Sequence, residues 1–356
     1  MNNALVLTNG FYTEGTAKTA HGLVRGTQRF TIKGIIDHAA SGNDAGTLLD
    51  GKARNIPILD SVESFFTQFP DTKINFIIVG IATLGGKLPS EMKEVFLKTI
   101  PKGISVVNGL HDFLNDHADL VALAQKHQVQ LIDVRRPKPF HELHSWTGNI
   151  KQVTCPRIAV MGTDMGLGKR TTTKFLTDAC NASGIKAEMI YTGQTGWMQG
   201  FKYGFILDST LNDFVSGELE NAVFECWKNE KPDVIFLEGQ SSLRNPAGPC
   251  GAEYLLSAEA KGVIIQHGPG REFFRHQEKA GNRIPSLASE IELVRFYGSE
   301  VLATTFNTAG LSGEETLHYQ SLYQQTLNLP VILPKEEGVE ILLPIIKNFI
   351  KQHTKL

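Results

Sequence analysis

The sequence lacks a long apolar run and lacks the cysteine pairs that bind zinc. Its longest apolar stretch, residues 74–82, is well short of the ~20 residues that a membrane-spanning helix needs. The four cysteines lie far apart without a C-x-x-C motif, which is typical of reduced thiols. The amino terminus lacks the basic and long apolar regions of a secretory signal. We therefore expect a cytoplasmic protein.

An excess of charge of one sign is also missing. The chain has 35 Lys and Arg against 37 Asp and Glu, a formal net charge of -2. Proteins that neutralise nucleic-acid phosphates carry a basic surface, so we expect neither a nucleic-acid nor a membrane partner. Hydrophobic residues make up 41% of the chain, which excludes disorder as the main state. The expected partners are a small-molecule substrate and further copies of the chain.

The 356 residues suffice for about two domains, and the first half alternates apolar runs with helical patterns. Predicted strands cover residues 4–8, 33–36, 74–81, 104–107 and 129–133, and predicted helices cover residues 16–24, 61–69, 90–99 and 118–127. Continuous apolar strands that alternate with helices form parallel sheets covered on both faces. We therefore predict a Rossmann-like domain over residues 1–134. The proline-containing polar stretch 135–156 is predicted to be a linker.

The second half repeats this alternation from residue 157 to residue 356. Predicted strands cover residues 157–161, 187–191, 233–237, 262–266 and 301–305, and predicted helices cover residues 169–182, 212–227, 286–296 and 336–351. The expected fold class is therefore α/β with two doubly wound domains, the second resembling P-loop NTPases.

A glycine-rich loop, M-G-T-D-M-G-L-G-K-R-T-T-T over residues 161–173, is the strongest functional signal. It follows an apolar strand and opens a helix, the context in which backbone N–H groups and a lysine hold phosphate. Its glycines let the backbone approach an anion without Cβ clashes. The predicted cofactor-binding residues are Gly162, Thr163, Gly166, Gly168, Lys169, Arg170, Thr171, Thr172 and, after a later strand, Asn307.

Arg170 stands where a P-loop normally has the Ser or Thr that binds Mg²⁺. Metal-assisted phosphoryl transfer needs that ion, and an arginine cannot coordinate it. Thr171 or Thr172 could replace the hydroxyl only from a different helical phase. The loop therefore favours an anionic cofactor that keeps its phosphates, such as coenzyme A.

Polar side chains follow other predicted strands, where parallel α/β sheets bind ligands. Glu238 suits a metal ligand, a general base, an amine site or a cap for its own loop, while His267 suits an acid or base. Arg271 suits a carboxylate or phosphate, and the loop 192–197 is rich in small residues. The sequence H-E-L-H at 141–144 lacks the spacing of the H-E-x-x-H motif, so we expect no metal site.

The motifs resemble those of a known family. GTDMGLGK and EGQSSL resemble the dethiobiotin-synthetase branch of P-loop proteins, which uses ATP. A closer resemblance covers nearly the whole chain: a two-domain family long catalogued as a domain of unknown function has motifs similar to GTDMGLGKRTT, DFVSG, EGQSSLRNP and HGPGR in this sequence. Members of that family are associated with D-glutamate N-acetyltransferase activity, so the resemblance implies acetyl transfer from acetyl-CoA to the amino group of D-glutamate.

The chemistry of that implied reaction suggests roles for the candidate residues. Glu238 or His267 would take a proton from the substrate ammonium. The candidate catalytic residues are Glu238, His267 and Asp164, and the candidate substrate-binding residues are Gln240, Arg244, Arg271 and Gln194. The arginines would pair with substrate carboxylates.

Two other functions stay open from the sequence. An ATP-dependent ligase or kinase for a small carboxylate or amine would hold Mg²⁺ through Glu238, Asp164 or a shifted threonine. A nucleotide-sensing binding protein would use the same loop without catalysis. The first domain has a candidate site of its own, at Asn9-Gly10 and at residues 108–111, with a fold-level likeness to the CoA-binding domain of acyl-CoA synthetases.

Overall fold

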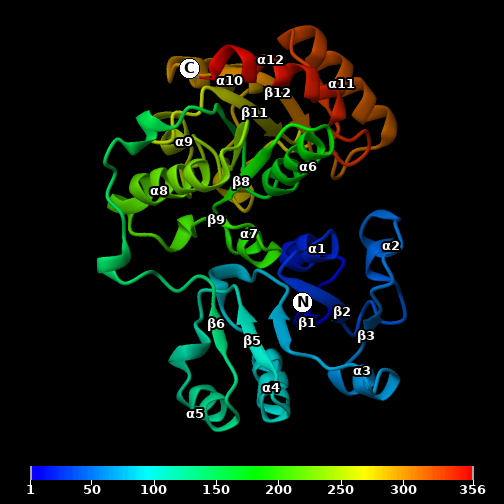
Figure 1. Cartoon of the computed structure of the whole chain (residues 1–356). Helices are drawn as coiled ribbons and strands as arrows, with labels where there is room; N and C mark the ends of the chain where they lie inside the picture. The colour runs from blue at the N-terminus through cyan, green and yellow to red at the C-terminus, as the bar shows by residue number, and fades with distance from the viewer. Residues whose placement is uncertain (1, 355–356) are drawn as a thin grey trace. The chain divides into compact units, whose positions relative to one another are not determined.

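The computed structural model describes residues 2–354, and the chain folds into two compact units (Figure 1). The first unit runs from the amino terminus through Pro137 and also takes in Gln194–Phe201. The second consists of Lys138–Gly193 and of the chain from Lys202 onward. Each unit is built on one parallel sheet, so the prediction of two doubly wound α/β domains is confirmed.

The first unit has a six-stranded sheet with the order β3-β2-β1-β4-β5-β6. Its strands are β1 (Asn2–Leu7), β2 (Phe30–Ile36), β3 (Ile58–Leu59), β4 (Phe76–Val79), β5 (Ser105–Asn108) and β6 (Leu131–Asp133). Its helices are α1 (Lys18–Val24), α2 (Ala45–Asp50), α3 (Val62–Gln68), α4 (Ser90–Thr99), α5 (Ala118–His127) and α7 (Gln194–Gln199). All neighbouring strands pair in parallel, and this strand order is that of the Rossmann fold.

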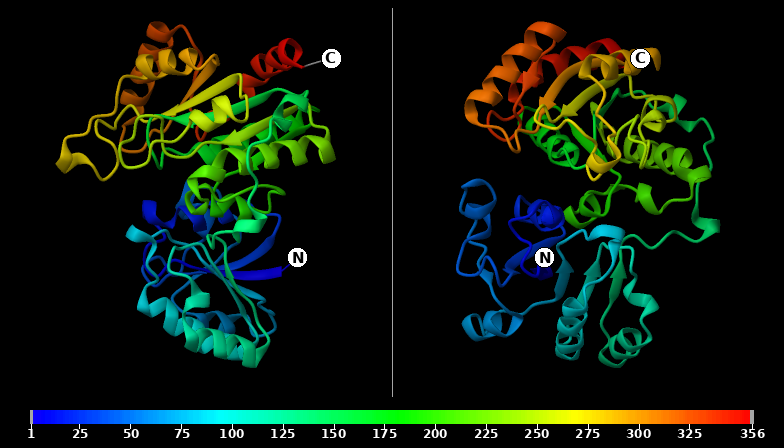
Figure 2. Two further views of the ribbon diagram at one scale, coloured as in Figure 1. Left: turned by 90° about the vertical axis from the view of Figure 1, so that its left-hand side faces the viewer. Right: turned by 180° about the vertical axis from the view of Figure 1, so that it is seen from behind.

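The second unit has a seven-stranded parallel sheet with the order β13-β12-β11-β7-β10-β8-β9. Its strands are β7 (Arg157–Gly162), β8 (Ala187–Tyr191), β9 (Tyr203–Gly204), β10 (Val234–Glu238), β11 (Gly262–His267), β12 (Glu300–Phe306) and β13 (Val331–Ile332). Its helices are α6 (Lys169–Ala182), α8 (Asn212–Glu230), α9 (Ala252–Leu256), α10 (Leu287–Phe296), α11 (Gly313–Leu327) and α12 (Leu343–His353). Figure 2 shows α11 in orange and α12 in red from two further sides.

Both faces of the second sheet are buried, as the apolar sequence of β7 requires. Ile158 and Val160 pack into a cluster with residues of α6 and α12. The alternate residues Ala159 and Met161 pack into another cluster, with residues of α8 and α10. Successive strand residues point to opposite faces, so a strand between two helix layers has no polar face. Ligands of such a sheet bind at the carboxyl ends of its strands.

Helix α7 corrects one prediction, because the sequence 192–197 was expected to be a loop. Gln194–Gln199 is helical and belongs to the first unit. Met198 is fully buried in the core of that unit, and its carbonyl accepts a hydrogen bond from Thr27 Oγ1 at 2.9 Å. The Arg29 guanidinium lies 4.0 Å from the centre of the Trp197 ring. Tertiary packing of this kind, rather than local propensity, explains a helix that contains a glycine.

The segment expected to be a linker, 135–156, divides between the units at Lys138. Ile150 and Val153 are fully buried in the core of the second unit. The Glu220 carboxylate accepts hydrogen bonds from the backbone N–H groups of Thr147 at 2.6 Å and Ile150 at 3.1 Å. This part of the segment is therefore not a free linker: the Glu220 side chain of α8 binds its backbone to the second unit.

The carboxyl-terminal helices differ from the prediction. The structure has a helix at Gly313–Leu327 that the sequence did not predict, and the helix expected at 336–351 begins only at Leu343. Gly338 has a φ of +81°, a left-handed conformation that does not continue a helix. Across residues 2–354, the helices are too short or too polar to cross a bilayer.

Candidate functional site

The phosphate loop has the geometry that the sequence predicts. It joins β7 to α6, and Thr163 N donates to Gln266 O at 3.1 Å. Gly166 and Gly168 have φ values of +69° and +103°, which favour glycine strongly. A Cβ at Gly162 would approach Gln266 O to 3.0 Å, so a side chain there would crowd the loop. The first N–H groups of α6 have no partners within the helix and form an anion site.

The Lys169 side chain is buried between the phosphate loop and the loop after β10. Its Nζ donates to the carbonyl oxygens of Asp164 and Ser241, both at 2.7 Å. Only 5% of the residue is exposed, and burial lowers the pKa of its ammonium to about 8. The amine is therefore fixed beside the loop by two carbonyls, and a phosphate oxygen would be a further acceptor for it.

Asp164 binds three segments together. Its fully buried carboxylate accepts hydrogen bonds from Asn245 Nδ2 at 2.9 Å, Arg271 Nη1 at 2.7 Å and Arg275 N at 2.9 Å. These donors come from the loops after β10 and β11. With no exposed surface and three partners, Asp164 holds those loops to the phosphate loop, and its predicted catalytic role stays a prediction.

Glu238 ends β10 and is buried beside the loop. Its Oε2 accepts a hydrogen bond from Thr192 N at 3.0 Å. Burial raises the pKa of the carboxyl group to about 7, and the positive charge of Arg170 opposes that rise. A carboxylate that titrates near neutrality suits a general base. Gln240 lies close by, since its Nε2 and the Glu238 carbonyl both bond to Thr192 Oγ1, at 3.0 and 2.7 Å.

His267 ends β11 and is also buried. Its Nδ1 lies 2.9 Å from Thr163 Oγ1, within hydrogen-bond distance. Burial and the nearby charge of Arg271 lower the pKa of the imidazole to about 4, so the ring is neutral at pH 7. Glu238 and His267 end the two strands that flank β7, which brings both predicted bases to the phosphate-loop strand.

Two threonines of α6 differ in what their hydroxyls do. Thr172 Oγ1 donates to Gln266 Oε1 at 2.6 Å, and Thr305 Oγ1 donates to the same oxygen at 2.8 Å. The Thr172 hydroxyl is therefore bonded to the sheet, while Thr171 is only partly buried. Asn307 Nδ2 donates to Leu167 O at 2.9 Å, so this side chain supports the loop that it was predicted to join.

The other predicted substrate residues are dispersed. Arg244 pairs with the buried Glu290 of α10 at 2.5 Å, and Arg271 pairs with Asp164. Gln194 begins α7 and lies in the first unit, in contact with Gly109. The structure thus joins Arg271 to the phosphate loop directly and binds Arg244 to a different carboxylate.

Sequence reasoning missed four polar residues that build this site: Thr192, Gln266, Asn245 and Arg275. Two buried hydroxyl groups in the E-G-Q-S-S loop, those of Ser241 and Ser242, have no hydrogen-bond partner among the described residues. Ser241 has a φ of +25°, a strained conformation for a residue other than glycine. Strain and unpaired hydroxyls at one turn are typical of a ligand site.

In the first unit, the turn that follows β1 is held by hydrogen bonds to Asp37. Asp37 Oδ2 accepts hydrogen bonds from Gly10 N and Tyr12 N, both at 2.9 Å, and from Thr8 Oγ1 at 2.7 Å. A Cβ at Gly10 would meet the His38 ring at 2.7 Å. At the candidate turn Asn9-Gly10, the Asp37 carboxylate therefore accepts the backbone hydrogen bonds that an anionic ligand would otherwise accept.

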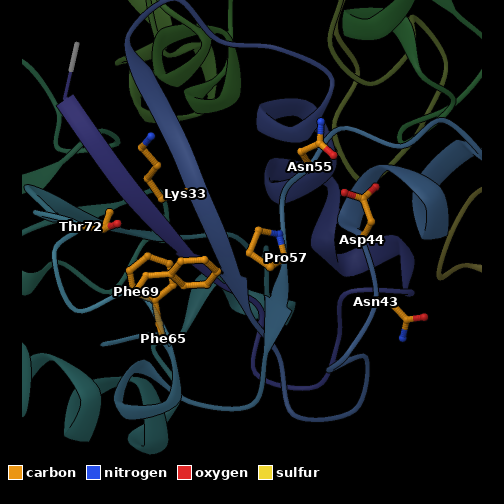
Figure 3. Close-up of a pocket in the computed structure, with 8 residues that line it drawn as sticks. All are labelled: Lys33, Asn43, Asp44, Asn55, Pro57, Phe65, Phe69 and Thr72. Atoms are coloured by element: carbon orange, nitrogen blue, oxygen red, sulfur yellow. The ribbon is translucent and has the colours of Figure 1, made fainter. Parts of the chain in front are cut away.

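A separate cavity of about 500 Å³ lies in the first unit (Figure 3). Lys33 comes from β2, and the Phe65 and Phe69 rings line the cavity on one side. Asp44, on another side, accepts hydrogen bonds from the backbone N–H groups of Thr47 and Ile56, both at 2.9 Å. None of the predicted site residues lines this cavity.

Comparisons with known proteins agree with the two folds. Residues 144–343 match the family described as "Domain of unknown function (DUF1611_C) P-loop domain", and residues 38–137 match the "DUF1611_N" Rossmann-like domain. A solved structure of a DUF1611 family protein from Anabaena variabilis is similar with a TM-score of 0.87 and 27% identity, covering 98% of this chain and 100% of that one.

Two curated relatives, from Pseudoalteromonas sp and Tritonibacter scottomollicae, are both named D-glutamate N-acetyltransferase. They are 28% and 26% identical to this chain over 270 and 267 residues, and each alignment covers 74% of this chain and 78% of the relative. The family resemblance predicted from the loop motifs is thereby confirmed. With both of its domains matched in order, the chain belongs to the DUF1611 family.

Proposed function

We propose that this protein is an acetyltransferase that moves the acetyl group of acetyl-CoA to the amino group of D-glutamate. The observation that carries the proposal is the phosphate loop, in which Lys169 and Arg170 open α6, so that the residue directly after the lysine has no hydroxyl. Two cations at a helix amino terminus favour a multiply charged phosphate ligand without requiring Mg²⁺. The names of the two curated relatives support the same activity.

The residues present fit the phosphates of coenzyme A. Gly168 leaves space at the loop, since the nearest atom to a Cβ there would be Asn307 Nδ2 at 3.9 Å, and the amino terminus of α6 directs backbone N–H donors toward the loop. The unpaired hydroxyls of Ser241 and Ser242 add donors in the turn whose Ser241 carbonyl accepts from Lys169. When bound, acetyl-CoA supplies an acetyl group as a thioester, so that a C–N bond forms, a C–S bond breaks and the thiolate leaves.

The chain must accept a proton from the substrate, because only the neutral amine is a nucleophile. Glu238 and His267 are the two bases at the strand ends. The carboxylate, with a pKa of about 7, is better matched to neutral pH than the imidazole, with a pKa of about 4. The accepted proton then becomes available to the leaving thiolate.

Purified protein incubated with D-glutamate and acetyl-CoA should release coenzyme A thiol, measured with a thiol reagent, and should form N-acetylglutamate. L-Glutamate and an arm with ATP and Mg²⁺ are run in parallel. Turnover of the amino acid with ATP and none with acetyl-CoA would show that the proposal is wrong and would favour a ligase or kinase.

The pH dependence separates the two bases. A base works only when deprotonated, so with Glu238 in that role kcat/KM should rise with pH through about 7 and be lost as the pH falls below it. With His267 in that role, the rise should be centred near pH 4 instead. Glu238→Gln should remove the transition near 7, whereas Glu225→Gln, half-buried on α8 and paired with Lys228, should keep it. An unchanged profile in Glu238→Gln would exclude Glu238 as the base.

A further inference from the structure

A second cavity lies beside the phosphate loop in the second unit, with a volume of about 160 Å³. Its polar lining comes from the end of β11, the loop that follows it, the residue that caps α10, and α11, namely His267, Arg271, Glu272, Arg283, Ser286 and Tyr323. Pockets for drug-sized ligands run from ~300 to 1,000 Å³, so this one suits a small polar molecule rather than a whole nucleotide cofactor.

Two lining residues are bonded directly to consecutive residues of the phosphate loop. His267 Nδ1 lies 2.9 Å from Thr163 Oγ1, and Arg271 Nη1 donates to Asp164 Oδ2 at 2.7 Å. The cavity and the phosphate loop therefore share a wall. A molecule in the cavity would lie next to whatever the loop holds.

The cavity offers donors that the protein does not use. Arg271 Nη1 donates to Asp164 Oδ2 and to Met165 O. Its Nε and Nη2 donate to none of residues 2–354. The Tyr323 hydroxyl likewise has no hydrogen-bond partner there, while its ring is held 5.3 Å from Phe306 and 5.7 Å from His267. A fixed ring with an unused hydroxyl, beside an unused guanidinium edge, is suited to an acceptor such as a carboxylate.

Arg283 adds a second cation that a ligand can recruit. It pairs with Glu272, and both side chains are largely exposed, at 67% and 57%. Exposed ion pairs contribute little to stability, so an entering carboxylate can take the place of Glu272. His267 is neutral near pH 7, which leaves the two arginines and Glu272 as the charged groups of the lining. The start of α10 at Ser286 also favours an anion.

We infer that this cavity binds the carboxylate groups of a short dicarboxylic amino acid, through Arg271, Arg283 and the Tyr323 hydroxyl. The inference rests on the proposed function and assigns its acceptor subsite. Two guanidinium groups match two carboxylates, and the shared wall sets the amine beside the phosphate loop. Recognition by planar, paired hydrogen bonds would discriminate against amino acids with neutral side chains.

Steady-state kinetics of Arg283→Gln and Tyr323→Phe test this assignment. Arg283 is exposed and the Phe variant keeps the ring, so both should fold. Losing a charge-assisted hydrogen bond should raise KM for D-glutamate about 10-fold or more in Arg283→Gln, and less in Tyr323→Phe. KM for acetyl-CoA should stay within about 2-fold, because that binding loop is untouched. Arg295→Gln, exposed on α10, and Tyr319→Phe, on the same helix α11 as Tyr323, are matched controls.

Equal KM values in Arg283→Gln and Arg295→Gln would overturn the inference while leaving the acetyltransferase activity intact. Calorimetric titration with D-glutamate and with glutarate, which has no amine, provides a readout independent of turnover. Binding of both by the unmodified protein and its weakening in Arg283→Gln support the subsite even if no acetyl transfer occurs. Absence of D-glutamate binding to the unmodified protein at millimolar concentration would refute it.

Discussion

Replacing Lys169 with alanine will lower kcat/KM for acetyl-CoA by about 100- to 1000-fold, because the variant loses the charge that opens α6. Hydrogen bonds to charged groups are worth about 1.5–3 kcal/mol each, and one ammonium can reach several phosphate oxygens. The substitution also leaves the carbonyls of Asp164 and Ser241 without their donor. Kinetics at saturating D-glutamate, together with titration of coenzyme A, measure the loss.

The matched control is Lys174→Ala on the same helix. Lys174 pairs with Asp178 one turn away at 2.5 Å and contacts no other charged side chain among residues 2–354. Surface pairs of this type contribute about 0.3–0.5 kcal/mol, so the control should retain normal kinetics. If Lys169→Ala and Lys174→Ala bind coenzyme A equally well, the phosphate loop does not hold this ligand.

Asp164→Asn should lower the free energy of unfolding by about 3 kcal/mol, since breaking a buried charge pair leaves the partner uncompensated. The carboxylate accepts from Asn245, Arg271 and the Arg275 N–H, and an amide would turn one acceptor into a donor that faces donors. Urea unfolding followed by circular dichroism at pH 7 gives the change.

Asp178→Asn tests whether that loss is specific. Asp178 lies on α6 as an exposed partner of Lys174. Its substitution should therefore change the free energy of unfolding, measured in urea, by no more than about 0.5 kcal/mol. Similar midpoints for the two variants would mean that the loops after β10 and β11 are held by other contacts. Asp164 would then be free for the catalytic role predicted from the sequence.

The regular elements of the sheets were predictable because their strands are buried on both faces. The apolar runs at Ala187–Tyr191 and at 157–161 match β8 and nearly all of β7, and the helix Lys169–Ala182 has the expected span. Helix α11 was missed because its core-facing side is weakly apolar: Thr316 is its one buried residue, and Tyr319, Tyr323 and Leu327 pack on the core while partly exposed. Helix α7 was missed because packing, not pattern, stabilises it.

The sequence predicts which residues belong to the candidate site, but not which side chains they contact. The motifs place Lys169 at the start of a helix and Glu238 and His267 at strand ends, and the structure has them there. Which carboxylate each arginine meets depends on long-range contacts, such as Arg244 with Glu290, and no local pattern encodes these. A motif also cannot identify a buried amide such as Gln266, because most glutamines lie on protein surfaces.

The excursion of the chain at α7 limits how this protein can be divided. The polypeptide leaves the second unit after Gly193, adds one helix to the first and returns at Lys202. A chain ended at Pro137 would lack Met198 from its core and the Gln199 amide that donates to Gly22 O and Gly26 O. The Rossmann-like half is thus not a module that a single gene truncation releases, and its separate expression would require α7 to be supplied again, by fusion or as a peptide.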